Sequence, residues 1–227
     1  MQARRQRRRA VAIILAFLSA AGLAVGAFGD RWLALPDYAG DSSVSSPFQS
    51  SSGGMGLRDY ERCRRDVCKS ISHSDLMDVL EAEIQQIKEE NAKLPLKEQR
   101  ALPRAPWHGF PVVGMMAFVL ALVAAGGLLV GGIIALSGKR VTLPIMPTTI
   151  AVLGLALSII TGCIFIATKP DLTDALVVGW SFIAFGGAAV LGLAAVFPLN
   201  RAIRPIDTDL GEASATMSWG DSRDDQP

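Results

Sequence analysis

The sequence predicts an all-α membrane protein, a left-handed bundle of four transmembrane helices. Half of the 227 residues are hydrophobic and 19% are charged, yet four long segments contain no Asp, Glu, Lys or Arg: 10–29, 110–136, 143–168 and 175–199. Each is long enough for a helix to cross a hydrocarbon core, which takes about 20 apolar residues. The net charge of +1 excludes a strongly basic nucleic-acid binder, and the apolar content excludes a disordered chain.

The basic residues predict the orientation of these helices. Five arginines lie between Arg4 and Arg9, directly before the first apolar segment, and Lys139 and Arg140 separate the second and third segments. Because cytoplasmic loops carry an excess of Lys and Arg, both termini are expected inside a plasma membrane or bacterial inner membrane. The chain then divides into a cytoplasmic N terminus (1–9), an external first loop (30–109), a cytoplasmic turn (137–142), an external second loop (169–174) and a cytoplasmic acidic tail (200–227). Residues 1–29 could alternatively be a cleaved signal sequence, although their apolar run is longer than a usual signal core.

The composition of the spans indicates a role in helix packing and not in catalysis or proton-coupled transport. Proton-coupled transporters and intramembrane proteases need ionisable groups at membrane depth, and the spans contain none. We therefore expect no catalytic residues, no cofactor and no metal. Small residues recur at four-residue spacing, which places them on one helix face where two backbones can approach closely. They are Gly22 and Gly26, Gly127 and Gly131, Gly154, Ser158 and Gly162, and Ala188 and Gly192. Pro198 is expected to end the fourth helix.

Two cysteines, Cys63 and Cys68, lie five positions apart in the first loop. In an oxidising compartment outside the cytoplasm, a structural disulfide is the first interpretation. A redox-active pair is a second one, because neighbouring arginines would lower a thiol pKa, although the C-x-x-C spacing is absent. A metal site made by both cysteines and His73 lacks a fourth ligand. The third cysteine, Cys163, is expected to be buried in the third span.

The rest of the loop predicts short elements. Residues 74–93 have the periodicity of an amphipathic helix, and Ser72 with Asp75 is typical of a capping box at its start. We expect this helix to lie on the rest of the loop, with a docking surface for a partner helix as the alternative. Short strands are expected at 32–35 and 44–49. Trp32 and Trp107 stand near the ends of spans, where aromatic residues anchor at the membrane interface.

The order Trp32, Gly56 and Leu57, Cys63 and Cys68 within this topology resembles the claudin superfamily, which includes claudins, peripheral myelin proteins and receptor auxiliary subunits. The family pattern is W, GLW, C and C; here Arg58 stands in place of its second Trp. The resemblance implies that the first loop folds as a small antiparallel sheet stapled by the disulfide, with one short helix. The tail ends in Asp225, Gln226 and Pro227, so no PDZ scaffold is expected as a partner.

The resemblance further implies a non-enzymatic protein that acts by contacts. The first hypothesis is cell–cell adhesion or barrier formation through the first external loop. The alternative is a lateral accessory subunit of a channel, transporter or envelope complex, which would use the small-residue helix faces. A membrane thiol oxidoreductase that uses Cys63 and Cys68 is the third. The expected partners are membrane lipids and a protein in cis or in trans, a second copy of the chain included, and no nucleic acid.

Overall fold

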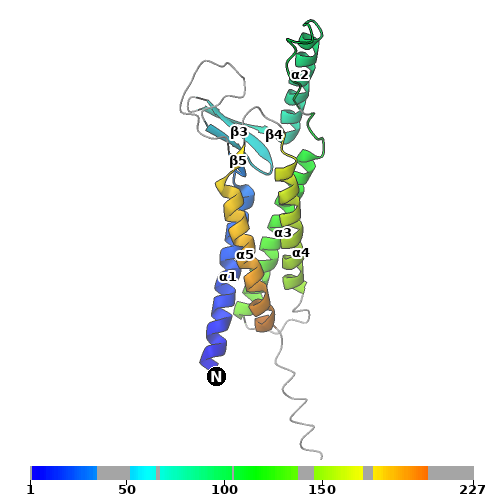
Figure 1. The fold of residues 1–227 in the computed structure, drawn as a ribbon. Helices are drawn as coiled ribbons and strands as arrows, with labels where there is room; N and C mark the ends of the chain where they lie inside the picture. The colour runs from blue at the N-terminus through cyan, green and yellow to red at the C-terminus, as the bar shows by residue number, and fades with distance from the viewer. Residues whose placement is uncertain are drawn as a thin grey trace, which may run out of the picture.

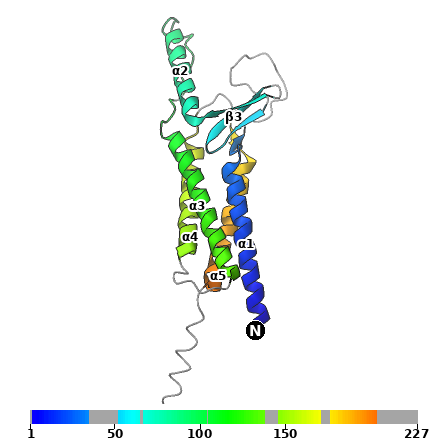
Figure 2. The same cartoon turned by 180° about the vertical axis from the view of Figure 1, so that it is seen from behind.

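The computed structural model describes residues 2–34, 52–64, 67–103, 105–137, 146–170 and 176–203. Four of its helices are long and apolar enough to cross a membrane, which confirms the prediction of four such helices. They are α1 (Gln2–Phe28), α3 (Phe110–Ser137), α4 (Met146–Ala167) and α5 (Trp180–Ile203). The helices run side by side in alternating directions, with a small sheet at one end of the bundle and the N terminus at the other (Figures 1 and 2). We call these the sheet end and the opposite end.

Small residues fill the centre of the bundle. α1 packs mainly against α5 and α3, and α4 packs mainly against α3. The fully buried positions are dominated by alanine, as at Ala12, Ala16, Ala20, Ala117, Ala121, Ala124, Ala151 and Ala195. In a lipid environment, where apolar side chains gain little by leaving lipid, close backbone approach supplies van der Waals contact between helices. The bundle therefore combines close contact between helix backbones with a few large buried side chains, such as Leu128, Phe165 and Phe185.

Two helix ends differ from the sequence-based expectation. α1 starts at Gln2 instead of residue 10, and its Arg9 Nε donates to Ala135 O at 2.8 Å, which ties this end of α1 to α3. α5 continues to Ile203, so the expectation that Pro198 ends the helix is wrong. The missing proline amide is tolerated because Leu199 and Ile203 are buried against Ala16, Ala135 and Ala195.

The sheet joins both loops at the sheet end. Its strands are β1 (Leu33–Ala34), β2 (Ser52–Met55), β3 (Asp59–Arg64), β4 (Val67–Ser72) and β5 (Val177–Val178), in the order β4-β3-β2-β1-β5. All pairings are antiparallel, which confirms a small antiparallel sheet. The strand β5 was not predicted. Because it occupies Val177 and Val178, α5 begins at Trp180 and not at residue 175, where the fourth span was expected to begin. The strand expected at 44–49 lies outside the described residues. Of the expected turn at 137–142, the loop at 169–174 and the tail at 200–227, the structure describes Ser137, 169–170 and 200–203.

Helix α2 (His73–Asn91) follows β4 without a gap. Ser72 caps the helix as predicted, since its Oγ accepts from Asp75 N at 3.1 Å; the Asp75 carboxylate accepts from the Ser72 hydroxyl at 2.8 Å instead of from the Ser72 backbone N–H that a full capping box uses. The helix does not lie flat on the loop as expected. Its first turns bury Leu76 and Met77 against the sheet and α3, and the remainder projects away from the bundle (Figure 1).

Candidate functional site at the junction of sheet and bundle

Trp32 connects the end of α1 to the sheet. Its indole ring has no exposed surface, and its Nε1 donates to Gly26 O at 2.6 Å. The backbone N–H of Trp32 donates to Met55 O at 3.0 Å. Trp32 is therefore hydrogen-bonded to the residue directly before Gly56. The prediction that Trp32 anchors at the membrane interface is wrong, because phenylalanines of α4 and α5 enclose the ring. The ring centroids of Phe165, Phe182 and Phe185 lie 6.3, 5.4 and 5.0 Å from it.

Gly56 and Leu57 form the turn between β2 and β3. Gly56 N donates to Asp59 O at 2.9 Å, and a Cβ at Gly56 would lie 3.2 Å from Gly29 O. Leu57 is buried. A Cβ added to Gly114 of α3 would lie only 2.4 Å from the carbonyl oxygen of Leu57, so the two backbones are in close contact. The turn therefore sits directly against the first turns of α3. Three of the five residues on which the resemblance rests, Trp32, Gly56 and Leu57, thus gather at one junction, whereas Cys63 and Cys68 lie on β3 and β4.

Arg58 occupies the position of the second tryptophan in the family pattern. Its side chain is exposed, and its guanidinium carbon lies 5.2 Å from the ring centroid of Phe28 and 5.1 Å from that of Phe118. These two rings are themselves in edge-to-face contact, with centroids 5.1 Å apart. A guanidinium over aromatic faces is attracted by the negative charge of the ring faces. The arginine thus bridges α1 and α3 at the sheet end.

His73, which the sequence suggests only as a candidate metal ligand, is a buried histidine. It is 2% exposed, and its ring lies 5.2 Å from that of Phe110 and 5.6 Å from that of Phe165. The backbones of Asp59 and Gly56 lie near the ring, but neither ring nitrogen forms a hydrogen bond of good geometry with a described residue. Burial lowers the pKa of His73 to about 4, against a smaller opposing effect of Asp59. The neutral imidazole is therefore part of the apolar contact between α2 and the bundle.

The sequence contained a signal for this role. His73 begins the apolar face of α2, which continues through Leu76, Met77 and Leu80 at helical spacing. The metal site considered for His73 requires the imidazole beside two thiols, whereas its ring is held between two phenyl rings. Within the described part of the chain, no three His, Cys, Asp or Glu side chains are grouped so that they could hold a metal ion.

The cysteines of the first loop are cross-strand neighbours. The register of β3 and β4 places Cys63 opposite Cys68. Cys68 is not a free thiol, and the side chain of Cys63 is outside the described set. Cys163 is a free cysteine on the exposed surface of α4, so the expectation that it is buried is wrong.

The predicted small residues lie inside the bundle, and most of them meet another helix. A Cβ added to Gly22, Gly26 or Gly154 would come within 2.7–3.1 Å of Ala188, Phe185 or Ala124, respectively. The remaining glycines have similar neighbours: Ala151 for Gly127, Leu199 for Gly131, Trp32 for Gly162 and Ser19 for Gly192. Ser158 is also buried and donates to Leu155 O of its own helix at 2.9 Å. These faces are therefore occupied by the chain itself.

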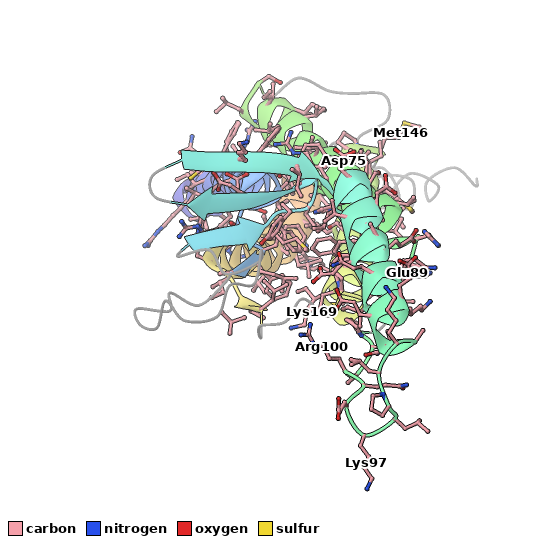
Figure 3. The ribbon with its side chains drawn as sticks, turned by 90° about the horizontal axis from the view of Figure 1, so that it is seen from above. Asp75, Glu89, Lys97, Arg100, Met146 and Lys169 are labelled. Atoms are coloured by element: carbon pink, nitrogen blue, oxygen red, sulfur yellow. The ribbon has the colours of Figure 1, made fainter. Side chains whose placement is uncertain are left out.

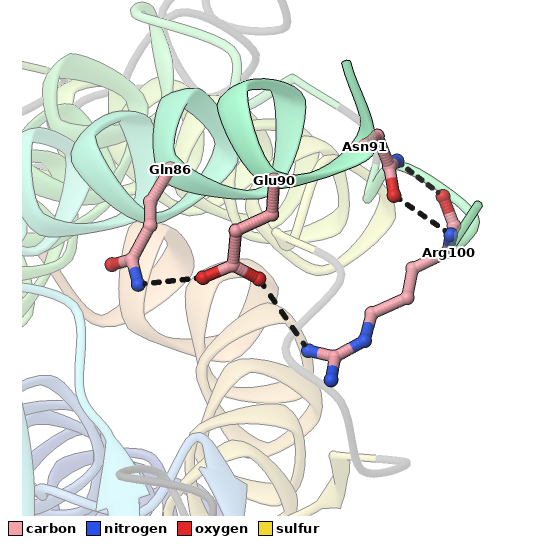
Figure 4. Close-up of polar contacts among 4 residues, drawn as sticks. All are labelled: Gln86, Glu90, Asn91 and Arg100. Atoms are coloured by element: carbon pink, nitrogen blue, oxygen red, sulfur yellow. Dashed lines mark hydrogen bonds and ion pairs between the residues drawn. The ribbon is translucent and has the colours of Figure 1, made fainter. Parts of the chain in front are cut away.

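Helix α2 and the segment after it form what we call the arm, residues 73–103, of which the part beyond the first turns of α2 projects from the bundle. Asn91 closes the helix end, because its Nδ2 donates to Arg100 O and its Oδ1 accepts from Arg100 N, both at 2.8 Å (Figure 4). Glu90 accepts from Gln86 and lies 3.9 Å from the Arg100 guanidinium. Seen along the bundle axis, the arm reaches well past the sheet, with Lys97 near its tip (Figure 3). Leu96 beside it is 88% exposed.

No protein-family model matches the chain, and no curated protein matches it.

Proposed function

We propose that the protein is a claudin-like integral membrane protein without enzymatic activity, which acts by protein contacts in cell–cell adhesion or barrier formation. In this proposal both termini are cytoplasmic, and the sheet and the arm lie outside the cell. The arginines between Arg4 and Arg9 support this orientation, because basic residues are retained on the cytoplasmic side. The burial of Trp32, Gly56 and Leu57 at one junction supports the family relationship.

The arm is the observation that carries the proposal. It is the part of the described chain that extends farthest from the bundle at the sheet end (Figure 1). Its tip exposes Leu94 and Leu96, and the paired hydrogen bonds between Asn91 and Arg100 hold the tip in a fixed shape. Apolar side chains gathered into one exposed patch mark contacts with other proteins, and we take Leu94 and Leu96 as part of such a patch.

A Cys63–Cys68 disulfide belongs to the same proposal. Directly opposed residues of antiparallel strands have Cα atoms about 4.5 or 5.5 Å apart, and both values lie within the range that a disulfide spans. The bond would close a short loop and contribute about 2 kcal/mol to the stability of a sheet with few large apolar side chains. It would hold the start of the arm in register with β3.

The test is the distribution of a fluorescently tagged chain in a mixture of expressing and non-expressing cells. We expect enrichment where two expressing cells touch, and loss of that enrichment when Leu94 and Leu96 are both changed to Ser or when Cys63 and Cys68 are both changed to Ser. Val79→Ser is the matched control, because Val79 is an exposed apolar residue of α2 away from the tip. An even distribution of the wild-type chain, or enrichment that survives the tip change, would contradict the proposal.

A lateral accessory subunit is the second candidate, and one observation favours it. The faces first considered for a lateral partner are occupied by internal contacts, but a Cβ on Gly186 or Gly187 of α5 would meet nothing within 4 Å. Another helix could approach the α5 backbone closely at this point. If a partner binds there, Gly187→Leu should remove it from the purified complex while Gly126→Leu, at another open glycine, should retain it. A partner that remains with the Gly187→Leu variant would exclude this face.

A further inference from the structure

Arg58 places a positive charge on the surface of the bundle beside two spanning helices. Phe28 is the last residue of α1, and Phe118 lies eight residues into α3, so a guanidinium in contact with both rings lies beside the apolar ends of these spans. Phe28 is 51% exposed, and Met115, one turn from Phe118 on α3, is also exposed. The charge is therefore next to a surface that faces lipid when the helices span a membrane.

No carboxylate of the described chain forms an ion pair with this guanidinium. The close contacts between basic and acidic side chains of the described residues are in or next to the arm, between Arg100 and Glu90 and between His108 and Glu81. The neighbouring acid, Asp59, instead accepts a hydrogen bond from Ser70 Oγ at 2.9 Å. A charged group beside the hydrocarbon region is costly without a partner, and an arginine near a helix end reaches the interface to find one.

We propose that Arg58 binds the phosphate of a phospholipid in the leaflet at the sheet end. A guanidinium presents paired N–H donors that match two phosphate oxygens, and stacking on the rings of Phe28 and Phe118 fixes the direction of these donors. The exposed part of Phe28 and the side chain of Met115 supply an apolar surface for the first carbons of the acyl chains. This surface distinguishes a lipid phosphate from a free phosphate ion. The proposal goes beyond the adhesion function and does not depend on it.

The test uses the full chain purified in detergent, with phosphatidylglycerol as the probe. We expect added phosphatidylglycerol to raise the melting temperature and to remain bound in native mass spectrometry. Arg58→Gln should require about tenfold more lipid for the same effect, the loss expected for a charge-assisted hydrogen bond. Arg58→Lys, which keeps the charge but not the paired donors, should fall between the two. Arg100→Gln, at an exposed arginine of the arm, should behave as the wild type.

Two further measurements identify the ligand. Diacylglycerol, which has no phosphate, and inorganic phosphate, which has no acyl chain, should each leave the melting temperature unchanged. A shift with inorganic phosphate equal to that with lipid would overturn the lipid assignment, and equal lipid dependence of the wild type and Arg58→Gln would overturn the site. If Arg58→Gln does not fold, Phe118→Leu keeps the charge and removes one ring; lipid binding unchanged by that variant would also overturn the proposal.

Discussion

The indole of Trp32 fills the space that a side chain at position 162 would need. A Cβ on Gly162 would lie 3.1 Å from Cζ3 and 3.3 Å from Cη2 of the tryptophan. The ring therefore connects the end of α1 to α4, although these helices are not main packing partners. This contact, together with the hydrogen bond from the indole to Gly26 O, fixes where the sheet begins relative to the bundle.

Gly162→Leu is expected to destabilise the protein by about 1–3 kcal/mol, because the added side chain must displace the buried indole. The melting temperature in detergent should fall, and so should the protection of the Trp32 fluorescence from a water-soluble quencher. Gly126→Leu is the matched control, since a Cβ at this glycine of α3 meets nothing within 4 Å. Equal stability of the two variants would mean that Trp32 does not need the space at Gly162.

The buried His73 predicts a stability that depends on pH. Burial lowers its pKa in the folded protein to about 4 from the ordinary 6.5, so the unfolded chain binds the proton more readily. The stabilising effect of the neutral form is fully present above pH 6.5 and is lost as the pH falls towards 4. The loss amounts to about 3 kcal/mol at most, from 1.36 kcal/mol for each pKa unit.

Unfolding between pH 7.5 and 4.5 measures this effect. His73→Phe keeps a ring between Phe110 and Phe165 and should reduce the pH dependence over this interval. The chain has one other histidine, His108, which is exposed beside Glu81, so His108→Gln serves as the control and should retain the dependence. A wild-type protein equally stable at both pH values would contradict a buried neutral imidazole.

The cysteines separate the structural disulfide from the redox hypothesis. A structural bond between Cys63 and Cys68 should stay oxidised in cells, whereas a redox-active pair must cycle through free thiols. Maleimide labelling of the protein unfolded in detergent without reductant should therefore modify Cys163, the free thiol of α4, and leave the other two unmodified until a reductant is added. Labelling of all three cysteines without reductant would exclude the structural bond.

The spans and the start of α2 were predictable because their causes are local. Charge-free segments of sufficient length specify spanning helices, and Ser72 with Asp75 specifies a helix start regardless of the rest of the chain. The end of α5 was not predictable. Pro198 disfavours a helix locally, but burial of Leu199 and Ile203 against α1 and α3 extends it.

The junction was the least predictable part. Trp32, with its position at the end of a span, has the sequence signature of an interface anchor. It is buried only because Gly162, distant in sequence, leaves room and because three phenylalanines of α4 and α5 surround it. The contact of Arg58 with Phe28 and Phe118 likewise joins three separate segments. The periodicity of a single segment does not predict contacts between segments that are distant in the sequence.

The tip of the arm depends on Asn91. Asn91→Ala removes both hydrogen bonds to the Arg100 backbone and leaves that amide and carbonyl unpaired, a local cost of about 1–3 kcal/mol. We expect faster amide hydrogen exchange and faster trypsin cleavage at Lys97, with no change in the exchange of α3 and α4, because the bundle does not contact the tip. Gln86→Ala removes the exposed hydrogen bond to Glu90 on the same helix and should leave the tip protected. If Asn91→Ala left the cleavage rate unchanged, the two hydrogen bonds between Asn91 and Arg100 would not be what holds the tip. The rigidity that the proposed contact requires would then have no basis in this pair.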